Sequence, residues 1–141
     1  MFLDAAYVAK YYVTEPDSAA VRRAVQGADS LVSSAWSIVE VSTALRRHVR
    51  EGKLTVPQFG AALQLFREHA ESGIWTLVPV NEQLFWRTML RMTALPAGVF
   101  LRAGDAVQLA AAIEAGEREI WSSDRHLLSA APHFGLIART A

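Results

Sequence analysis

Short apolar segments alternate with longer helical segments along the whole of this 141-residue chain. Residues typical of β-strands occur at positions 1–3, 30–33, 74–80, 119–121 and 136–138. The segments between them have the spacing or the end signals of helices, at positions 5–13, 18–26, 35–51, 56–72, 82–94, 105–115 and 125–131. Parallel strands need long crossover connections, which helices usually provide. The alternation therefore predicts one α/β domain over residues 1–141, built on a central and mostly parallel sheet.

Capping residues mark the start of several of these helices. Thr55 is followed three residues later by Gln58, the spacing of a capping box, and Asn81 directly precedes another helical segment. Ser34 stands where it would cap the helix expected to begin at Ala35. These residues place the boundaries of three predicted helices.

The segment 105–115 is apolar on nearly every side and rich in alanine. A helix that is apolar all round is buried, and small side chains let it lie close to a sheet. Asp105 therefore stands at the mouth of a buried helix. Its charge is placed beside the core, where an unpaired carboxylate costs free energy.

Four acidic residues follow or interrupt apolar segments in this way, namely Asp4, Glu40, Asp105 and Asp124. In an open α/β sheet, ligands bind beyond the carboxyl ends of the strands. We expect one edge of the sheet to gather all four carboxylates, which would then repel one another and require a cation. Hard divalent ions prefer oxygen ligands, and Mg²⁺ takes a few carboxylates while keeping several waters. The sequence therefore predicts a metal site.

Each carboxylate also has a structural explanation when it is considered alone. Asp4 and Asp124 are suited to cap the helices that follow them. Asp105 in the first turn of a helix would be stabilised by the helix dipole. Glu40 lies within a helix, where capping does not explain it, although a solvent-facing position would.

Composition excludes some classes of protein. The chain has no cysteine, which removes thiol catalysis and cysteine-ligated metal sites. No apolar run approaches the roughly 18 residues of a membrane span. No basic leader precedes the first strand, so we expect a cytoplasmic protein. The formal net charge is zero, but setting the four site carboxylates aside leaves an excess of basic residues, all of them arginine except Lys10 and Lys53.

Four segments of the chain resemble the motifs of PIN-domain ribonucleases, and most closely those of VapC-type toxins from bacterial toxin–antitoxin pairs. They are Leu3-Asp4-Ala5, Ser37-Ile38-Val39-Glu40-Val41, Asp105-Ala106-Val107-Gln108-Leu109-Ala110-Ala111-Ala112 and Ser122-Ser123-Asp124-Arg125-His126-Leu127. The resemblance implies an α/β/α sandwich, an acidic cluster that binds Mg²⁺ or Mn²⁺, and endonucleolytic cleavage of RNA. It also implies a homodimer and a small cognate antitoxin as partner.

The resemblance assigns roles residue by residue. Asp4, Glu40, Asp105 and Asp124 match the acidic positions of the family, and Asp105 or Asp124 would accept a proton from the attacking water. Ser122 matches a position where the family has threonine or serine, which is usually interpreted as holding a water or a substrate oxygen. The segment before Asp4 is slightly shorter than is common in the family.

Three arginines are placed to contact RNA phosphates. Arg47 lies seven residues after Glu40, two helical turns along the same face. Arg102 lies three residues before Asp105, and Arg125 directly follows Asp124. Arginine forms bidentate contacts with phosphate. The i,i+4 pairs Arg46 with Arg50 and Arg87 with Arg91 are interpreted as solvated surface, and no two histidines have metal-ligand spacing.

Two other functions remain open on the sequence. One is a metal-dependent phosphoryl-transfer domain. A phosphatase of the haloacid type requires an Asp at position 6, where this chain has Ala6. A receiver domain requires a lysine late in the chain, and no lysine follows Lys53. No phosphate-binding glycine loop is present. A catalytically silent PIN-like binding module would have lost a carboxylate, and none is lost. Trp36, Trp75, Trp86 and Trp121 are most simply interpreted as core residues, with a partner-facing position as the alternative for Trp86.

Overall fold

The computed structural model describes all 141 residues and is built around a five-stranded sheet in which every pairing is parallel. The strand order is β3-β2-β1-β4-β5. The strands span Phe2–Leu3 (β1), Leu31–Ser34 (β2), Trp75–Val78 (β3), Glu119–Trp121 (β4) and Ile137–Arg139 (β5). The predicted α/β fold with a parallel sheet is confirmed.

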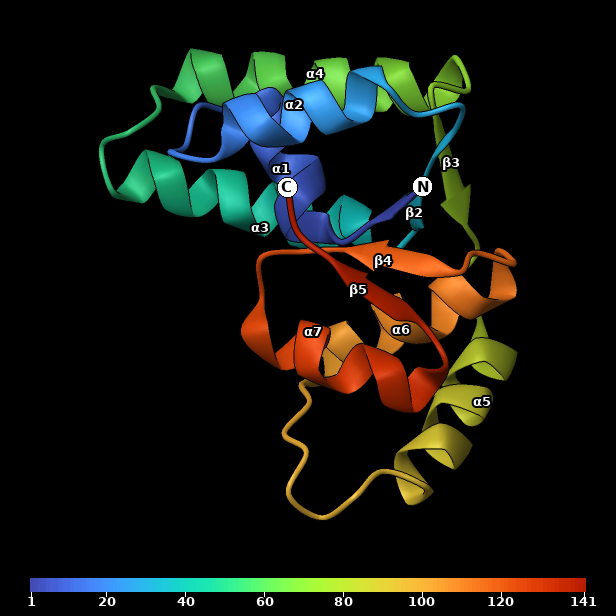
Figure 1. Ribbon diagram of the computed structural model, residues 1–141. Coiled ribbons are helices and arrows are strands. Elements are labelled where there is room, and N and C mark those ends of the chain that lie inside the picture. Colours follow the sequence, from blue (N-terminus) through green and yellow to red (C-terminus); the bar gives the residue numbers. More distant parts are fainter.

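Helices cover both faces of the sheet and complete an α/β/α sandwich (Figure 1). On one face lie α1 (Ala5–Tyr12), α2 (Ser18–Gln26), α3 (Ser37–Arg50) and α4 (Val56–Glu71). On the other face lie α5 (Glu82–Thr93), α6 (Ala103–Glu114), α7 (Arg125–Ala130) and the short 3-10 helix η1 (Ala131–Phe134). The chain therefore builds the two outer layers in sequence, the first from its N-terminal half and the second from its C-terminal half.

The short central strand β1 joins the two hydrophobic cores. Phe2 packs into the core beneath α5, α6 and α7, whereas Leu3 packs into the core beneath α1 to α4. Successive side chains of a strand point to opposite faces, so two residues suffice to contribute to both layers. Phe2 pairs with Val32 on one side and with Ile120 on the other, which brings distant parts of the chain to the residue just before Asp4.

The helix expected to be buried is buried. Every residue of α6 from Ala106 to Ala112 is buried. Asp105 is the third residue of this helix rather than its first, because α6 begins at Ala103. The charge still lies in the first turn, beside the core.

Local end signals predicted two helix starts correctly and one wrongly. Thr55 and Gln58 form both bonds of a capping box, and Asn81 accepts a hydrogen bond from the Leu84 N–H. Ser34 does not cap α3, since it is the last residue of β2 and the helix begins three residues later. Its pairing with Val78 extends the strand, a long-range contact that overrides the local preference of serine for caps.

None of the helices combines the length and the apolar character needed to cross a bilayer. The outer face of α5 is nevertheless apolar, because Phe85, Trp86, Met89 and Leu90 are all exposed, Trp86 by 56%. Trp86 is therefore not a core residue, and the alternative of an outward-facing position holds for it. Exposed apolar side chains gathered on one helix mark a surface suited to a partner.

Candidate functional site

All four predicted carboxylates line a single cavity of about 700 Å³. Asp4 follows β1 directly, and Asp124 lies in the loop between β4 and α7. Glu40 comes from the first turn of α3 and Asp105 from the first turn of α6. The same cavity is lined by four arginines, which are Arg46, Arg47, Arg50 and Arg102. The cavity therefore brings acidic and basic side chains together at the edge of the sheet where the parallel strands end.

The Asp4 carboxylate is buried and held from two sides. One oxygen caps α1 by accepting a hydrogen bond of 2.8 Å from the Tyr7 N–H, and the other accepts one from the Ser122 hydroxyl. Burial raises the pKa of Asp4 from its ordinary value to about 7, and the charges of Glu40 and Asp105 add to this rise. Its capping role and its place in the cavity are thus compatible.

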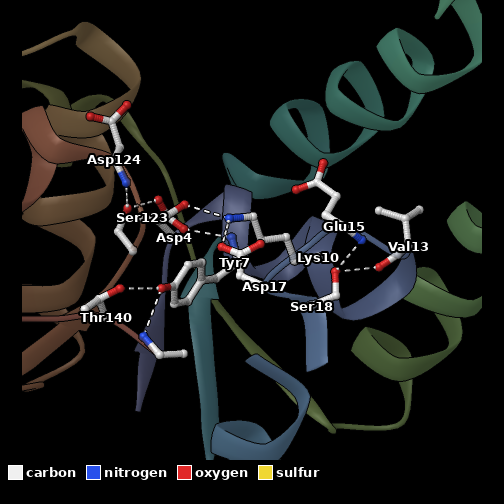
Figure 2. A network of polar contacts seen from close by, with 12 residues as sticks. Asp4, Tyr7, Lys10, Val13, Glu15, Asp17, Ser18, Ser123, Asp124 and Thr140 are labelled. Atoms are coloured by element: carbon white, nitrogen blue, oxygen red, sulfur yellow. Dashed lines mark hydrogen bonds and ion pairs between the residues drawn. The ribbon is translucent and has the colours of Figure 1, made fainter. Parts of the chain in front are cut away.

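The loop that carries Asp124 is anchored by the two serines that precede this residue. The Asp124 N–H donates to Ser122 Oγ at 2.9 Å, so Ser122 links this loop to Asp4. The next residue, Ser123, accepts a hydrogen bond of 2.8 Å from the buried Lys10 ammonium, which also pairs with Asp17 (Figure 2). Ser122 is fully buried, and its hydroxyl therefore orients a carboxylate and the loop in this arrangement.

Asp124 combines a capping bond with an ion pair. Its Oδ1 accepts hydrogen bonds from the His126 and Leu127 N–H groups at 2.7 and 3.3 Å, which caps α7. Its other oxygen lies 3.4 Å from Arg102 Nη1. The capping explanation for Asp124 is therefore right as far as one oxygen is concerned, and the second oxygen lies beside Arg102.

Glu40 is held by two residues of α6. Gln108 Nε2 donates to Glu40 Oε2 at 2.7 Å. A Cβ atom at Gly104 would lie 2.5 Å from Glu40 Oε1, so the carboxylate packs directly on the glycine. Burial raises the pKa of Glu40, the Asp105 charge adds to the rise, and the bond from Gln108 opposes it. Glu40 is thus a half-buried carboxylate and not a freely solvated one.

Asp105 differs from the other three carboxylates in its hydrogen bonding. Its Oδ2 atom is buried and has no hydrogen-bond partner, although buried polar atoms are almost always paired. Burial raises the pKa of Asp105, and the charge of Asp124 adds to the effect, whereas Arg102 opposes it. Asp105 also acts on the pKa of both Asp4 and Glu40. It is therefore electrostatically coupled to the other carboxylates, and its Oδ2 accepts no hydrogen bond from the protein.

The fit of a divalent ion depends on how many carboxylates are free to bind it. As the side chains lie, no group of three or more His, Asp or Glu residues could hold an ion together. Asp4, Glu40 and Asp124 each use one or both oxygens in protein hydrogen bonds. Mg²⁺ usually binds through only one or two carboxylates and keeps its remaining waters. The unpartnered oxygen of Asp105 and one neighbouring carboxylate make a set of ligands of that size. The residues therefore fit an ion whose remaining ligands are water molecules.

Raised carboxyl pKa values predict how the stability of the metal-free protein depends on pH. Between the unfolded pKa near 4 and the folded value of about 7, Asp4 binds a proton in the folded state but not in the unfolded state. Stability then falls as pH rises through this range, by up to about 1.4 kcal/mol per pH unit for one such group. Urea unfolding in EDTA at pH 5 and pH 7.5 measures the difference, and Asp4→Asn should remove much of it. A parent protein that is more stable at pH 7.5 would contradict this expectation.

The structure separates the predicted arginines. Arg47 and Arg102 line the cavity, with Arg102 beside Asp124, whereas Arg125 is exposed and outside the lining. Arg46 and Arg50, interpreted from the sequence as solvated surface, line the same wall as Arg47. The sequence does contain a signal for these residues, because Arg46, Arg47 and Arg50 fall within one and a half turns of the helix that carries Glu40. The four lining arginines leave a row of cationic groups next to the carboxylates.

Comparison with known proteins agrees with this architecture. The family model described as PIN domain matches residues 1–132. A search of curated proteins finds no match. Among solved structures, the fold is similar to VapC20 of Mycobacterium tuberculosis, described as a sarcin-ricin loop cleaving toxin, with a TM-score of 0.71 and 14% identity over 92% of this chain and 93% of that one.

Two further structures have the same fold at similarly low identity. One is VapBC2 of Rickettsia felis, bound to a DNA fragment from the promoter of VapBC2. It has a TM-score of 0.69 and 12% identity over 99% of this chain and 97% of that one. FitAcB of Neisseria gonorrhoeae has a TM-score of 0.65 and 14% identity over 97% and 94%. Since the family model covers nearly the whole length and the sandwich with its acidic cavity agrees with it, this chain belongs to the PIN-domain family.

Proposed function

We propose that this protein is a metal-dependent endoribonuclease that acts in the cytoplasm as the toxin of a toxin–antitoxin pair. The observation that carries the proposal is the cavity that is lined by both four carboxylates and four arginines. An acidic cluster alone would repel RNA, and a basic wall alone would only bind it. Together they suit a reaction in which a polyanion is held by arginine while its phosphate is attacked near a cation.

Each side of the cavity has a separate task in this reaction. The arginines of α3 and Arg102 would hold phosphates next to the scissile bond, since their guanidinium groups form paired hydrogen bonds with phosphate oxygens. Asp105, with one oxygen free of hydrogen bonds, is the carboxylate best placed to hold an ion or to accept a proton. Ser122 keeps Asp4 and the Asp124 loop in register. A bound Mg²⁺ or Mn²⁺ would supply positive charge and lower the pKa of a water.

The fold likeness to a VapBC pair supports a small antitoxin as the partner. The exposed apolar face of α5 is formed by Phe85, Trp86, Met89 and Leu90. It supports a homodimer, because association of two copies would remove this apolar surface from water. These assemblies, like the RNA substrate, are proposals for this chain.

Cleavage of RNA is expected only when a divalent ion is present. The purified protein is incubated with total RNA and with small structured RNAs, in Mg²⁺, in Mn²⁺ or in EDTA. Products in Mg²⁺ or Mn²⁺ that disappear in EDTA support the proposal, because no histidine pair or thiol offers another route. Cleavage that persists in EDTA would contradict a metal-dependent mechanism.

The result of a second measurement separates the alternatives. Mn²⁺ binding without cleavage of any RNA tested would favour a binding module with a PIN fold. Hydrolysis of a small phosphate ester without cleavage of RNA would favour a phosphoryl-transfer domain. Both outcomes would remove the ribonuclease proposal while leaving the metal site in place.

A further inference from the structure

Gln108 lies beneath the acidic cavity, in the middle of α6, with only 1% of its surface exposed. Its amide joins three elements. Nε2 donates to Ser37 Oγ at 2.9 Å and to Glu40 Oε2 at 2.7 Å, whereas Oε1 accepts from Ser34 Oγ at 2.8 Å. Both amide protons are used, and the carbonyl oxygen is paired. A buried polar group that is satisfied in this way is fixed in orientation.

The neighbouring hydroxyl groups determine which end of the amide faces Glu40. Ser33 donates its only hydroxyl proton to the Leu3 carbonyl at 2.8 Å, so the 2.7 Å bond between Ser33 and Ser37 must use the proton of Ser37. Ser37 then has only lone pairs left for Gln108. The amide must present its NH₂ group to Ser37, and the same NH₂ group reaches Glu40. Gln108 is therefore a donor to this carboxylate.

Gly104 restrains the same carboxylate from the other side. A Cβ atom at this position would lie 2.5 Å from Glu40 Oε1 and 3.3 Å from Trp36 Nε1. The backbone of Gly104 is not in the left-handed region, so an alanine is excluded by space and not by backbone conformation. Any side chain here would push the Glu40 carboxylate away from the position that Gln108 gives it.

We propose that Gln108 and Gly104 are positioning residues that hold Glu40 ready for a divalent ion. Gln108 donates to Oε2, and Gly104 leaves the space in which Oε1 lies. This inference rests on the metal-dependent function proposed above. It adds that two residues which need not touch the ion determine the affinity for it.

Gln108→Met keeps the size of the side chain and removes both donors. The affinity for Mn²⁺, measured by the electron paramagnetic resonance of free Mn²⁺ during a titration, should fall about 10- to 100-fold, the usual loss when a partner of a metal ligand is removed. Gln64→Met is the matched control, since Gln64 donates its amide to Glu68 at 2.9 Å on the exposed face of α4. It should bind Mn²⁺ like the parent. Circular dichroism checks that each variant is folded.

A double-substitution cycle distinguishes positioning from a general loss of structure. If Gln108 acts through Glu40, Gln108→Met should cost little further affinity in a Glu40→Gln background, where the carboxylate is already gone. If the effect is only structural, the same fold-loss should occur in both backgrounds, and the positioning role would be wrong.

Gly104→Ala tests the other restraint without removing any hydrogen-bonding group. Alanine is a better helix former than glycine, so α6 should not be weakened, yet Mn²⁺ affinity should fall by about 10-fold or more as Glu40 is displaced. Gly60→Ala in α4 is its control, because a Cβ there meets nothing within 4 Å. Parent-like affinity in both Gln108→Met and Gly104→Ala would overturn the inference while leaving the proposed function intact. A parent protein that binds no Mn²⁺ would overturn both.

Discussion

Asp105→Asn is expected to remove most of the stabilisation that a divalent ion gives to this protein. An ion present at about 100 times its dissociation constant should add about 2.7 kcal/mol to the stability of the parent. For a chain of this length, that corresponds to a rise in melting temperature on the order of 10 °C. Asp105 is the carboxylate with an unpartnered buried oxygen, so its loss should abolish this rise together with RNA cleavage.

The metal-free variant should melt no lower than the metal-free parent. Asp105 is placed among three other carboxylates, and burial together with the Asp124 charge opposes its ionisation. An amide removes this repulsion. Differential scanning calorimetry with Mn²⁺ or EDTA measures both effects, and Asp29→Asn at an exposed position is the control. If Asp105 only stabilises the start of α6, the variant should instead lose up to about 1 kcal/mol and keep its metal response.

Removing the three cavity arginines of α3 should greatly weaken the binding of single-stranded RNA. Each phosphate contact contributes about 0.7 to the slope of log affinity against log salt. The combined variant Arg46→Ala, Arg47→Ala and Arg50→Ala should therefore flatten the slope by about 2, which near 0.1 M salt is a loss of roughly 100-fold. Fluorescence anisotropy in EDTA at several salt concentrations measures binding without cleavage.

A charge-matched control is available elsewhere on the surface. Arg67, Arg87 and Arg139 are each paired with a glutamate and do not line the cavity. Replacing these three with alanine changes the net charge by the same amount and should leave the salt slope close to that of the parent. An equal loss in both triple variants would mean that the effect reflects overall charge and that the RNA lies elsewhere. Arg125→Ala, outside the cavity, should have a smaller effect than Arg47→Ala.

The features that could be predicted from the sequence are those set by local chemistry or by the rule for parallel sheets. The capping box at Thr55 and Gln58 depends on groups three residues apart, which a sequence shows directly. The gathering of Asp4 and Asp124 follows from the parallel strands that precede them, because the ends of such strands meet at one edge. Both steps need no knowledge of side-chain packing.

The details that were missed depend on contacts between distant residues. The local sequence indicates that Ser34 is a helix cap. Only its pairing with Val78 and its hydrogen bond to Gln108, 74 positions away, show that it belongs to a strand. The amide of Gln108 looks like one polar residue in an apolar helix, and nothing in its neighbours along the chain indicates Glu40. The contact of Gly104 with that carboxylate is equally hidden. Such contacts arise only when α3 and α6 are brought together by the sheet.

Arg46 and Arg50 show a different limit. Their i,i+4 spacing is typical of a solvated helix face, and both are indeed exposed. Exposure to water and exposure to a cavity give the same pattern of residues along a helix. The distinction depends on which face of α3 is turned toward the ends of β1 and β4, and this orientation is a property of the assembled layers.

The central position of β1 has a consequence for the time at which the protein becomes active during synthesis. Because β1 pairs with β4, Phe2 has both of its neighbouring strands only after residues 119–121 have been synthesised. Asp4 likewise obtains its serine partner only from residue 122. Contacts that join such distant residues form late and slowly. For the proposed toxin, the nascent chain would remain harmless until almost the whole sequence has emerged, which leaves an interval in which a partner made nearby can reach it first.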